Sequence, residues 1–247
     1  MIETWIYTLL AVLVVSLISL IGLITFAIKL EKLKKVLLLF VSFAAGALIG
    51  DAFIHLLPEA AVAGFTFELS ITVLAGIITF FIVEKFIHWR HCHEAGCRKH
   101  KHTLAYINIT GDIVHNFIDG MIIAASFLIN VPLGIATTIA VILHEIPQEI
   151  GDFSILMHSG LKRTKALLFN FLTALAAIAG AVLVLLLGNI EFLAGSLIPF
   201  AAGGFIYIAC ADLIPELHKE EKMIISLLQL AAFIIGIGVM TALLVVG

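Results

Sequence analysis

Apolar runs alternate with short polar connections along the whole chain. A helix needs about 20 mostly apolar residues to cross the hydrocarbon core of a bilayer. The pattern therefore predicts eight membrane-spanning helices, at roughly 5–28, 36–57, 67–87, 104–129, 133–158, 166–187, 192–216 and 223–246. We expect an all-α polytopic membrane protein that has the lipid bilayer as its surroundings.

The composition supports this class. Of the 247 residues, 62% are hydrophobic and 13% are charged, and mean hydropathy is +1.19, so the chain lacks the charge to coat a soluble surface. The net charge of −3 gives no basic surface for nucleic acid. Of the three cysteines, Cys92 and Cys97 fall in a polar loop and Cys210 in an apolar run, which argues against a disulfide framework.

The positive charges predict the orientation. All fourteen Lys and Arg fall at odd-numbered connections, at 29–35, 85–101, 162–165 and 219–222. By the positive-inside rule that side is cytoplasmic and both termini face out, in the plasma (inner) membrane. Because no Lys or Arg precedes the first apolar run, we expect 5–28 to be a spanning helix and not a cleaved signal peptide.

The second and seventh predicted spans contain an internal repeat. Residues 44–59 read AAGALIGDAFIHLLPE, and residues 201–216 read AAGGFIYIACADLIPE. The two segments run in opposite directions across the predicted bundle, a pattern typical of transporters built from inverted repeats. The alternative is that small-residue runs ending in proline simply aid close packing of membrane helices. The predicted division of the single transmembrane domain 1–247 is a first three-helix repeat (1–87), a His-rich cytoplasmic loop (88–103), a central helix pair with the metal site (104–158) and a second three-helix repeat (166–247).

Polar side chains interrupt the apolar runs at helical spacing. In the fourth span, four of them at i, i+3, i+4 and i+7 share one narrow stripe: Asp112, His115, Asn116 and Asp119. In the fifth span, five form two adjacent rows around Pro147, with His144 and Gln148 in one row and Glu145, Glu149 and Asp152 in the other. Further polar residues in the second, sixth and seventh spans are Asp51, His55, Glu59, Asn170, Asp212 and Glu216.

These buried acids need compensating positive charge. An ionised side chain at the bilayer centre costs about 2.5–3.5 kcal/mol or more. No Lys or Arg lies within the spans, and the nearest, Lys85, is at a helix end. Protons or metal ions must supply the charge, and His–carboxylate pairs one helical turn apart suit a divalent transition metal. A single buried His is more often a structural residue, and for Asn170 and Asp152 a structural role is as good an interpretation as an ionic one.

The motifs HNFIDG (115–120) and HEIPQEIGD (144–152), with GDAFIHLLPEA upstream, resemble those of the ZIP (Zrt/Irt-like) metal transporters. The closest subfamily reads HExPHExGD in its fifth helix. The resemblance implies a 3+2+3 helix arrangement and uptake of a divalent metal, chiefly zinc, through a central and often binuclear site between the fourth and fifth helices.

The resemblance also implies residue roles. His115 and His144, aided by His55, are expected to bind one metal, and Asn116, Asp119 and Glu145 to favour a second, with some side chains bridging. Gln148 and Glu149 complete the metal set, and the expected transport pathway adds Asp51, Asp112, Asp152, Asn170 and Asp212. The chain departs from the subfamily at Gln148, where the motif has His. We expect Zn²⁺ as substrate, with Fe²⁺, Mn²⁺ or Cd²⁺ as competitors and no organic cofactor, and we leave a homodimer open.

Three other functions remain open. An intramembrane metalloprotease needs HExxH, but position 148 is Gln. A proton- or sodium-coupled carrier leaves the histidines without a role, and a metal exporter has the same ligand chemistry. The loop adds irregularly spaced side chains that we expect to bind metal weakly: His88, His91, Cys92, His93, Cys97, His100 and His102.

Overall fold

The computed structural model describes residues 2–26, 30–62, 64–89, 100–188 and 190–246. Every regular element within these residues is a helix, and eight helical stretches are long and apolar enough to cross a membrane. They are Ile2–Leu23, Leu38–Ala60, Phe67–Lys85, Asn108–Ile129, Val131–Met157, Arg163–Leu187, Ser196–Leu217 and Met223–Leu244. Each overlaps one predicted span, so the prediction of an all-α polytopic membrane protein is confirmed.

Some spans are single helices and others are composite. The single helices are α4 (Phe67–Trp89), α5 (His100–Ile129), α6 (Val131–His158) and α11 (Met223–Val246). The composite spans are α1 (Ile2–Ile18) with the 3₁₀ helix Ser19–Phe26, α2 (Leu30–Asp51) with the π-helix Ala52–Leu56 and α3 (Leu57–Ala60), α7 (Arg163–Ala174) with α8 (Ala176–Leu187), and α9 (Ile190–Tyr207) with the π-helix Ile208–Leu213 and α10 (Ile214–Leu217).

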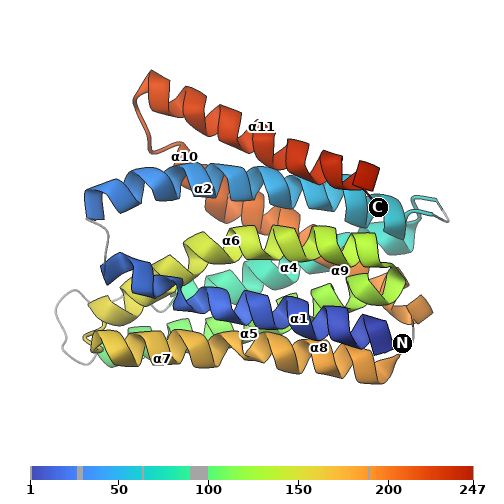
Figure 1. The fold of residues 1–247 in the computed structure, drawn as a ribbon, viewed down its shortest axis with the longest axis horizontal. Coiled ribbons are helices and arrows are strands. Elements are labelled where there is room, and N and C mark those ends of the chain that lie inside the picture. The colour runs from blue at the N-terminus through green and yellow to red at the C-terminus, as the bar shows by residue number, and fades with distance from the viewer. Residues whose placement is uncertain (1, 27–29, 63, 90–99, 189, 247) are drawn as a thin grey trace.

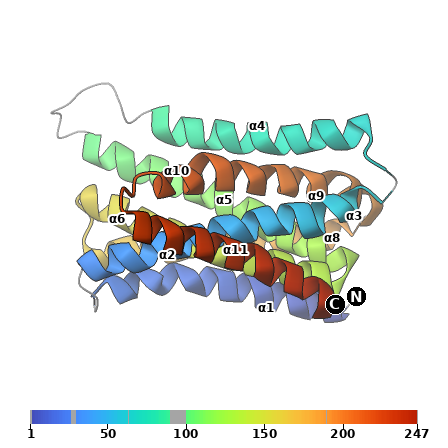
Figure 2. The same ribbon diagram turned by 90° about the horizontal axis from the view of Figure 1, so that it is seen from above.

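The helices form one elongated bundle (Figures 1 and 2). α1 begins and α11 ends at the same end of the bundle, which we name the termini end. α6 ends and α11 begins at the opposite end, which we name the loop end. This placement agrees with an even number of spans.

The two segments of the internal repeat adopt the same local structure. α2 continues into the π-helix Ala52–Leu56 and α9 into the π-helix Ile208–Leu213, and a four-residue α-helix with proline in its first turn follows each. Proline has no N–H to donate and its ring crowds the carbonyl one turn earlier, so the turn before it widens. The shared feature supports an inverted repeat, while the 3+2+3 arrangement as a whole stays a prediction.

The connection between α5 and α6 brings the central helices together. α5 ends at Ile129 and α6 begins at Val131, so Asn130 alone joins them. The Asn130 side chain caps α6 by accepting a hydrogen bond from the backbone N–H of Leu133 at 2.8 Å. Such a short connection makes α5 and α6 antiparallel neighbours, and their polar rows face each other at mid-span.

Candidate metal centre

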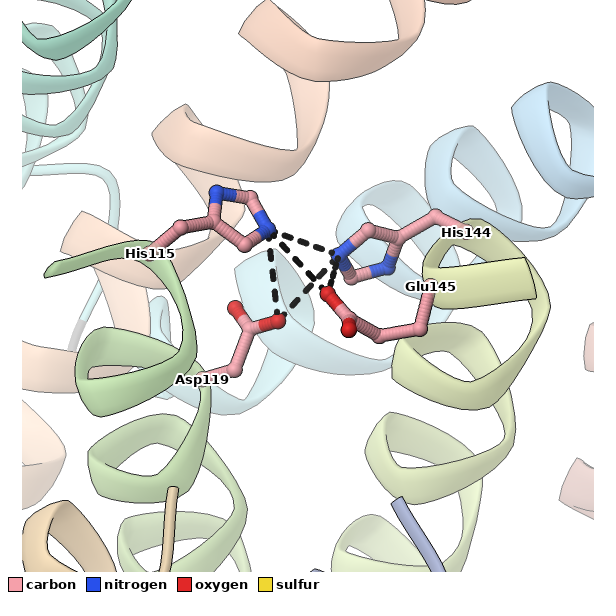
Figure 3. Close-up of side chains that lie close together, drawn as sticks. All are labelled: His115, Asp119, His144 and Glu145. Atoms are coloured by element: carbon pink, nitrogen blue, oxygen red, sulfur yellow. Dashed lines mark hydrogen bonds and ion pairs between the residues drawn. The ribbon is translucent and has the colours of Figure 1, made fainter. Parts of the chain in front are cut away.

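Four side chains from α5 and α6 converge in the middle of the bundle (Figure 3). His115 and Asp119 come from α5, one helical turn apart, and His144 and Glu145 come from α6. All four are buried, and one ligand atom from each lies within 4.8 Å of the others. Across the described ranges, no other group of three or more His, Cys, Asp or Glu side chains comes together in this way. We name this group the metal cluster.

The spacing of the donor atoms matches tetrahedral coordination. His115 Nε2 lies 3.3 Å from His144 Nε2, 3.5 Å from Asp119 Oδ2 and 3.4 Å from Glu145 Oε1. His144 Nε2 lies 3.2 Å from Asp119 Oδ2 and 3.7 Å from Glu145 Oε1. Ligands about 2.0–2.1 Å from a tetrahedral zinc ion stand about 3.3–3.4 Å apart, the length around which these five separations fall. The cluster can therefore offer two nitrogen and two oxygen ligands to one ion.

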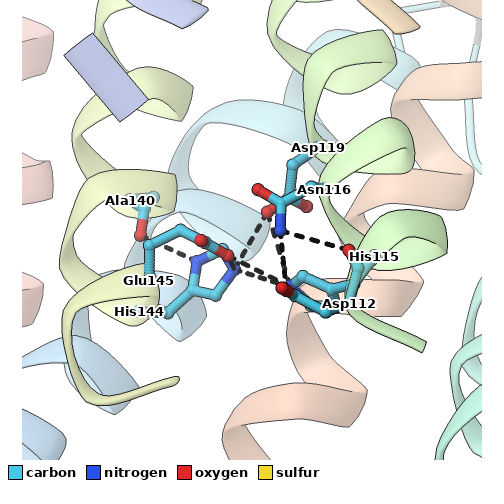
Figure 4. A network of polar contacts seen from close by, with 7 residues as sticks. All are labelled: Asp112, His115, Asn116, Asp119, Ala140, His144 and Glu145. Carbon is cyan, nitrogen blue, oxygen red and sulfur yellow. Dashed lines mark hydrogen bonds and ion pairs between the residues drawn. The ribbon is translucent and has the colours of Figure 1, made fainter. Parts of the chain in front are cut away.

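The tautomer of His144 follows from its second contact (Figure 4). Its Nδ1 lies 3.1 Å from the carbonyl oxygen of Ala140, one turn earlier on α6. Because a carbonyl oxygen only accepts, Nδ1 carries a proton, and in the neutral ring, the form that binds a metal, the Nε2 lone pair points into the cluster. A ligating histidine usually has such a support on its other ring nitrogen.

The two carboxylates of the cluster lack other stabilising partners. The oxygens of Asp119 and Glu145 are buried and lie at ion-pair distance from the imidazoles, but they accept no well-aligned hydrogen bond within the described structure. A buried polar atom without a hydrogen bond costs about 1–3 kcal/mol, and more when it is charged. A bound cation offsets this cost for both carboxylates at once.

Carboxylates and amides surround the cluster toward α7. Asn116 donates from Nδ2 to Asp112 Oδ1 at 2.7 Å (Figure 4), and Asn170 donates from Nδ2 to Glu149 Oε2 at 2.8 Å. Glu149 Oε1 and the side-chain oxygens of Asn116 and Asn170 are buried without a hydrogen-bond partner in the described structure. Glu149, Asn116 and Asn170 therefore each have an oxygen atom beside the cluster that accepts no hydrogen bond in the described structure. The amide groups of Asn116 and Asn170 donate to neighbouring carboxylates and not to the imidazoles.

A cavity of about 770 Å³ connects the cluster with the loop end. Its walls include His115, His144, Asp112, Gln148, Asp152 and Asp212, and it reaches Glu216 and Lys219, which form an ion pair just before α11. A second cavity of about 280 Å³ at the other end includes His55, Glu59 and Asn130 and none of the cluster residues. Within the described residues, the cluster is thus accessible from the loop end.

Several predicted residues lie elsewhere. His55 Nε2 is 2.9 Å from the carbonyl oxygen of Met240 on α11, and the structure does not bring His55 to the cluster. Asp51 is fully buried, and neither of its oxygens accepts a well-aligned hydrogen bond in the described structure. Four of the predicted loop ligands, His91, Cys92, His93 and Cys97, lie outside the described residues, as do the side chains of His88, His100 and His102.

Sequence reasoning missed three polar lining residues of the larger cavity, Glu84, Asn108 and Tyr207. Tyr207 donates a hydrogen bond from its hydroxyl to Glu84 of α4, and Asn108 lies one turn before Asp112 on α5. Asn108 could have been predicted from the sequence, because it continues the helical spacing of the polar stripe on α5. Tyr207 could not have been predicted from the internal repeat, because the matching position there is Gly50.

The fold defines a polytopic membrane protein, and the cluster has the donor set of a divalent-metal site. The family model described as "ZIP Zinc transporter" matches residues 2–105 and 90–244, and the chain belongs to this family. The relatives named below are called zinc transporters, and the similarity to them covers between 81% and 83% of this chain.

Three relatives illustrate the similarity. "Zinc transporter zipt-7.1" of Caenorhabditis briggsae is 34% identical over 272 residues, covering 82% of this chain and 69% of that protein. "Zinc transporter ZIP13" of Pongo abelii is 37% identical over 216 residues, covering 81% and 64%. "Zinc transporter zipt-7.2" of Caenorhabditis elegans is 32% identical over 265 residues, covering 83% and 57%. The chain thus spans between 57% and 69% of the length of these relatives.

Proposed function

We propose that this protein moves zinc ions across a membrane and that the transported ion binds the metal cluster. The observation that carries the proposal is the geometry of four buried donor atoms, two nitrogens and two oxygens, at tetrahedral spacing between two membrane-spanning helices. Imidazole nitrogen together with carboxylate oxygen suits zinc. The names of the relatives, all zinc transporters, support the same substrate.

The proposed direction is uptake into the cytoplasm. Lys162, Lys165, Lys219 and Lys222 all lie at the loop end, and Lys219 also lines the larger cavity. The positive-inside rule places such an end in the cytoplasm, in the plasma (inner) membrane that we propose. The described conformation then opens to the cytoplasm, and both termini lie outside.

Release follows from the chemistry of the cavity walls. A zinc ion that leaves the two imidazoles meets the carboxylates of the cavity wall, which include Asp112, Asp152, Asp212 and Glu216. Carboxylates hold zinc less selectively than imidazoles do, so the step from the imidazoles to these carboxylates replaces stronger ligands by weaker ones. The amide of Gln148, on the wall beside His144, assists this passage without adding a third nitrogen ligand to the cluster.

The proposal assigns roles to the parts of the chain. Residues 1–87 and 166–247 act as two three-helix repeats, and 104–158 act as the helix pair that holds the ion. The loop 88–103 binds metal weakly on the cytoplasmic side. Asp51, Asp112, Asp152, Asn170 and Asp212 line or support the pathway.

Flux into sealed vesicles tests the function. The purified protein is reconstituted into liposomes that contain a zinc-sensitive dye, and its orientation is fixed by the accessibility of a terminal tag to an impermeant protease. We expect dye response to external zinc through molecules whose termini face the outside, and loss of that response in His115→Ala. Flux equal to that of protein-free liposomes, or flux unaffected by His115→Ala, contradicts the proposal.

A further inference from the structure

Three helix crossings in the bundle bring backbone against backbone in the same way. In each, a glycine of one helix faces the carbonyl oxygen of the residue three positions before a glycine of the other helix. Between α2 and α11, a Cβ added at Gly46 would lie 2.0 Å from the carbonyl oxygen of Phe233, and one at Gly236 would lie 2.3 Å from that of Phe43. Between α4 and α9, the distances are 2.1 Å from Gly76 to Phe200 and 2.0 Å from Gly203 to Val73. Between α5 and α8, they are 1.8 Å from Gly120 to Ala177 and 2.0 Å from Gly180 to Phe117.

The α5–α8 crossing lies on the stretch of α5 that carries the metal ligands. Gly120 directly follows Asp119, and Phe117 lies between His115 and Asp119 in sequence. α8 itself contributes no residue to the metal cluster. Small residues let membrane helices approach until their backbones touch, where Cα–H···O contacts form. α8 therefore fixes the position of this stretch of α5 from the side away from the ion.

α6 has no comparable crossing among the described residues. An added Cβ at Gly134 meets only the ring of Phe127, and at Gly151 it meets nothing within 4 Å. The separations between the helices, such as 3.3 Å from His115 Nε2 to His144 Nε2 and 3.2 Å from Asp119 Oδ2 to His144 Nε2, depend on where α5 sits relative to α6. Metal–ligand distances must hold within about 0.2 Å, so a small shift of α5 changes how well an ion fits.

From this geometry we propose that Gly180 and Gly120 are positioning residues for the metal centre. Their contact sets the distance of α5 from α6, and through it the size of the ion that the four donor atoms accept. This inference rests on the proposed function of the cluster. It predicts that a methyl group wedged into the α5–α8 crossing pushes α5 toward α6, narrows the space between the four donor atoms and disfavours the larger Cd²⁺ relative to Zn²⁺.

The test uses three alanine substitutions with different geometry. Gly180→Ala places a methyl group 2.0 Å from the carbonyl oxygen of Phe117 and alters no ligand. Gly46→Ala creates the same clash, 2.0 Å from the carbonyl oxygen of Phe233, between two helices that hold no ligand of the cluster. Gly238→Ala adds a methyl group with no neighbour within 4 Å and controls for the substitution itself.

Two readouts separate positioning from general loss of stability. One is the ratio of zinc to cadmium flux, which does not depend on how much folded protein is present. The other is the visible absorption of bound Co²⁺, which is strong for tetrahedral and weak for six-coordinate ions. We expect Gly180→Ala to raise the zinc-to-cadmium ratio about tenfold, the lower end of what changes around metal ligands cause, and to alter the Co²⁺ absorption. Gly46→Ala and Gly238→Ala keep both at the wild-type values.

The outcomes are distinguishable. If Gly180→Ala and Gly46→Ala change both readouts equally, or neither changes them, the inference is wrong. If wild-type protein shows no tetrahedral Co²⁺ absorption, or shows it unchanged in His115→Ala, the proposed function fails first. Should Gly180→Ala yield no folded protein, Ala177→Gly loosens the same crossing by removing a buried methyl group, and it must lower the same ratio for the inference to stand.

Discussion

The Nε2 atoms of His115 and His144 lie 3.3 Å apart, although the residues belong to different helices and are 29 positions apart in sequence. Since the Ala140 carbonyl holds a proton of His144 on Nδ1, the Nε2 lone pair of the neutral His144 ring points at His115. A pair of imidazoles held between two buried carboxylates is an arrangement that a cation stabilises strongly.

Removing either imidazole should abolish most zinc transport. We expect His115→Ala and His144→Ala each to reduce zinc flux at least tenfold, because one of four ligands is lost. Both variants should insert normally, since deleting a polar side chain does not penalise insertion. His218→Ala is the matched control, because His218 is exposed after α10 and lies outside the cluster. Near-normal zinc flux in both cluster variants would show that neither histidine binds the transported ion.

Residue 148 should tune the choice between zinc and manganese. Gln148 lines the larger cavity one turn after His144. Gln148→His adds an imidazole and should raise zinc flux relative to manganese at low metal concentration, whereas Gln148→Glu adds a harder oxygen ligand and should lower that ratio. Competitive uptake of the two ions at fixed pH measures it. An identical ratio in wild type and both variants places residue 148 out of contact with the ion.

Replacing Asp51 should stabilise the protein and impair transport. Both Asp51 oxygens are buried and accept no well-aligned hydrogen bond in the described structure, where the side chain of Thr137 is their polar neighbour. Asp51→Leu keeps the side-chain shape and removes this cost, which amounts to about 1–3 kcal/mol. The unfolding temperature in detergent should therefore rise. Asp112→Leu is the contrasting variant, because it removes the carboxylate that accepts from the Asn116 amide, leaves that amide only the backbone carbonyl of residue 112, and should lower the unfolding temperature. A fall in both variants would mean that Asp51 has a stabilising partner.

The loop should modulate transport without being required for it. Changing His88, His91, Cys92, His93, Cys97, His100 and His102 together to Ser leaves the metal cluster intact. We expect zinc flux to change by less than about threefold, since weak, irregularly spaced ligands hold metal only transiently. Flux is compared per molecule of inserted protein. Its complete loss would place the loop in the obligatory pathway.

Helical periodicity was enough to predict the spans and the ligand rows on α5. His115 and Asp119, four residues apart, were expected on one face of a helix, and the structure brings their donor atoms within 3.5 Å. Residue types and spacing determine this much because both residues share one helix. The two motifs also pointed to α5 and α6 as partners.

The sequence alone did not predict which side chains of one helix contact those of another. Glu145 and Glu149 were expected in one row, yet Glu145 joins the cluster while Glu149 accepts a hydrogen bond from Asn170 of α7. His55 was expected to aid the first metal, but its nearest polar partner is the backbone of Met240. Periodicity defines the faces of a helix but not which neighbour each face meets. That depends on close crossings such as the contact between Gly120 and Ala177.

The most direct test of the central claim is the zinc K-edge X-ray absorption of purified protein carrying one zinc ion per chain. Our account predicts four nitrogen or oxygen neighbours about 2.0–2.1 Å from the zinc, with the outer-shell scattering of two imidazoles. Those imidazoles are His115 and His144, so each alanine variant should lose one of the two signals. A spectrum with six oxygen neighbours, or with no imidazole scattering, would contradict the assignment of His115, Asp119, His144 and Glu145 as the zinc ligands.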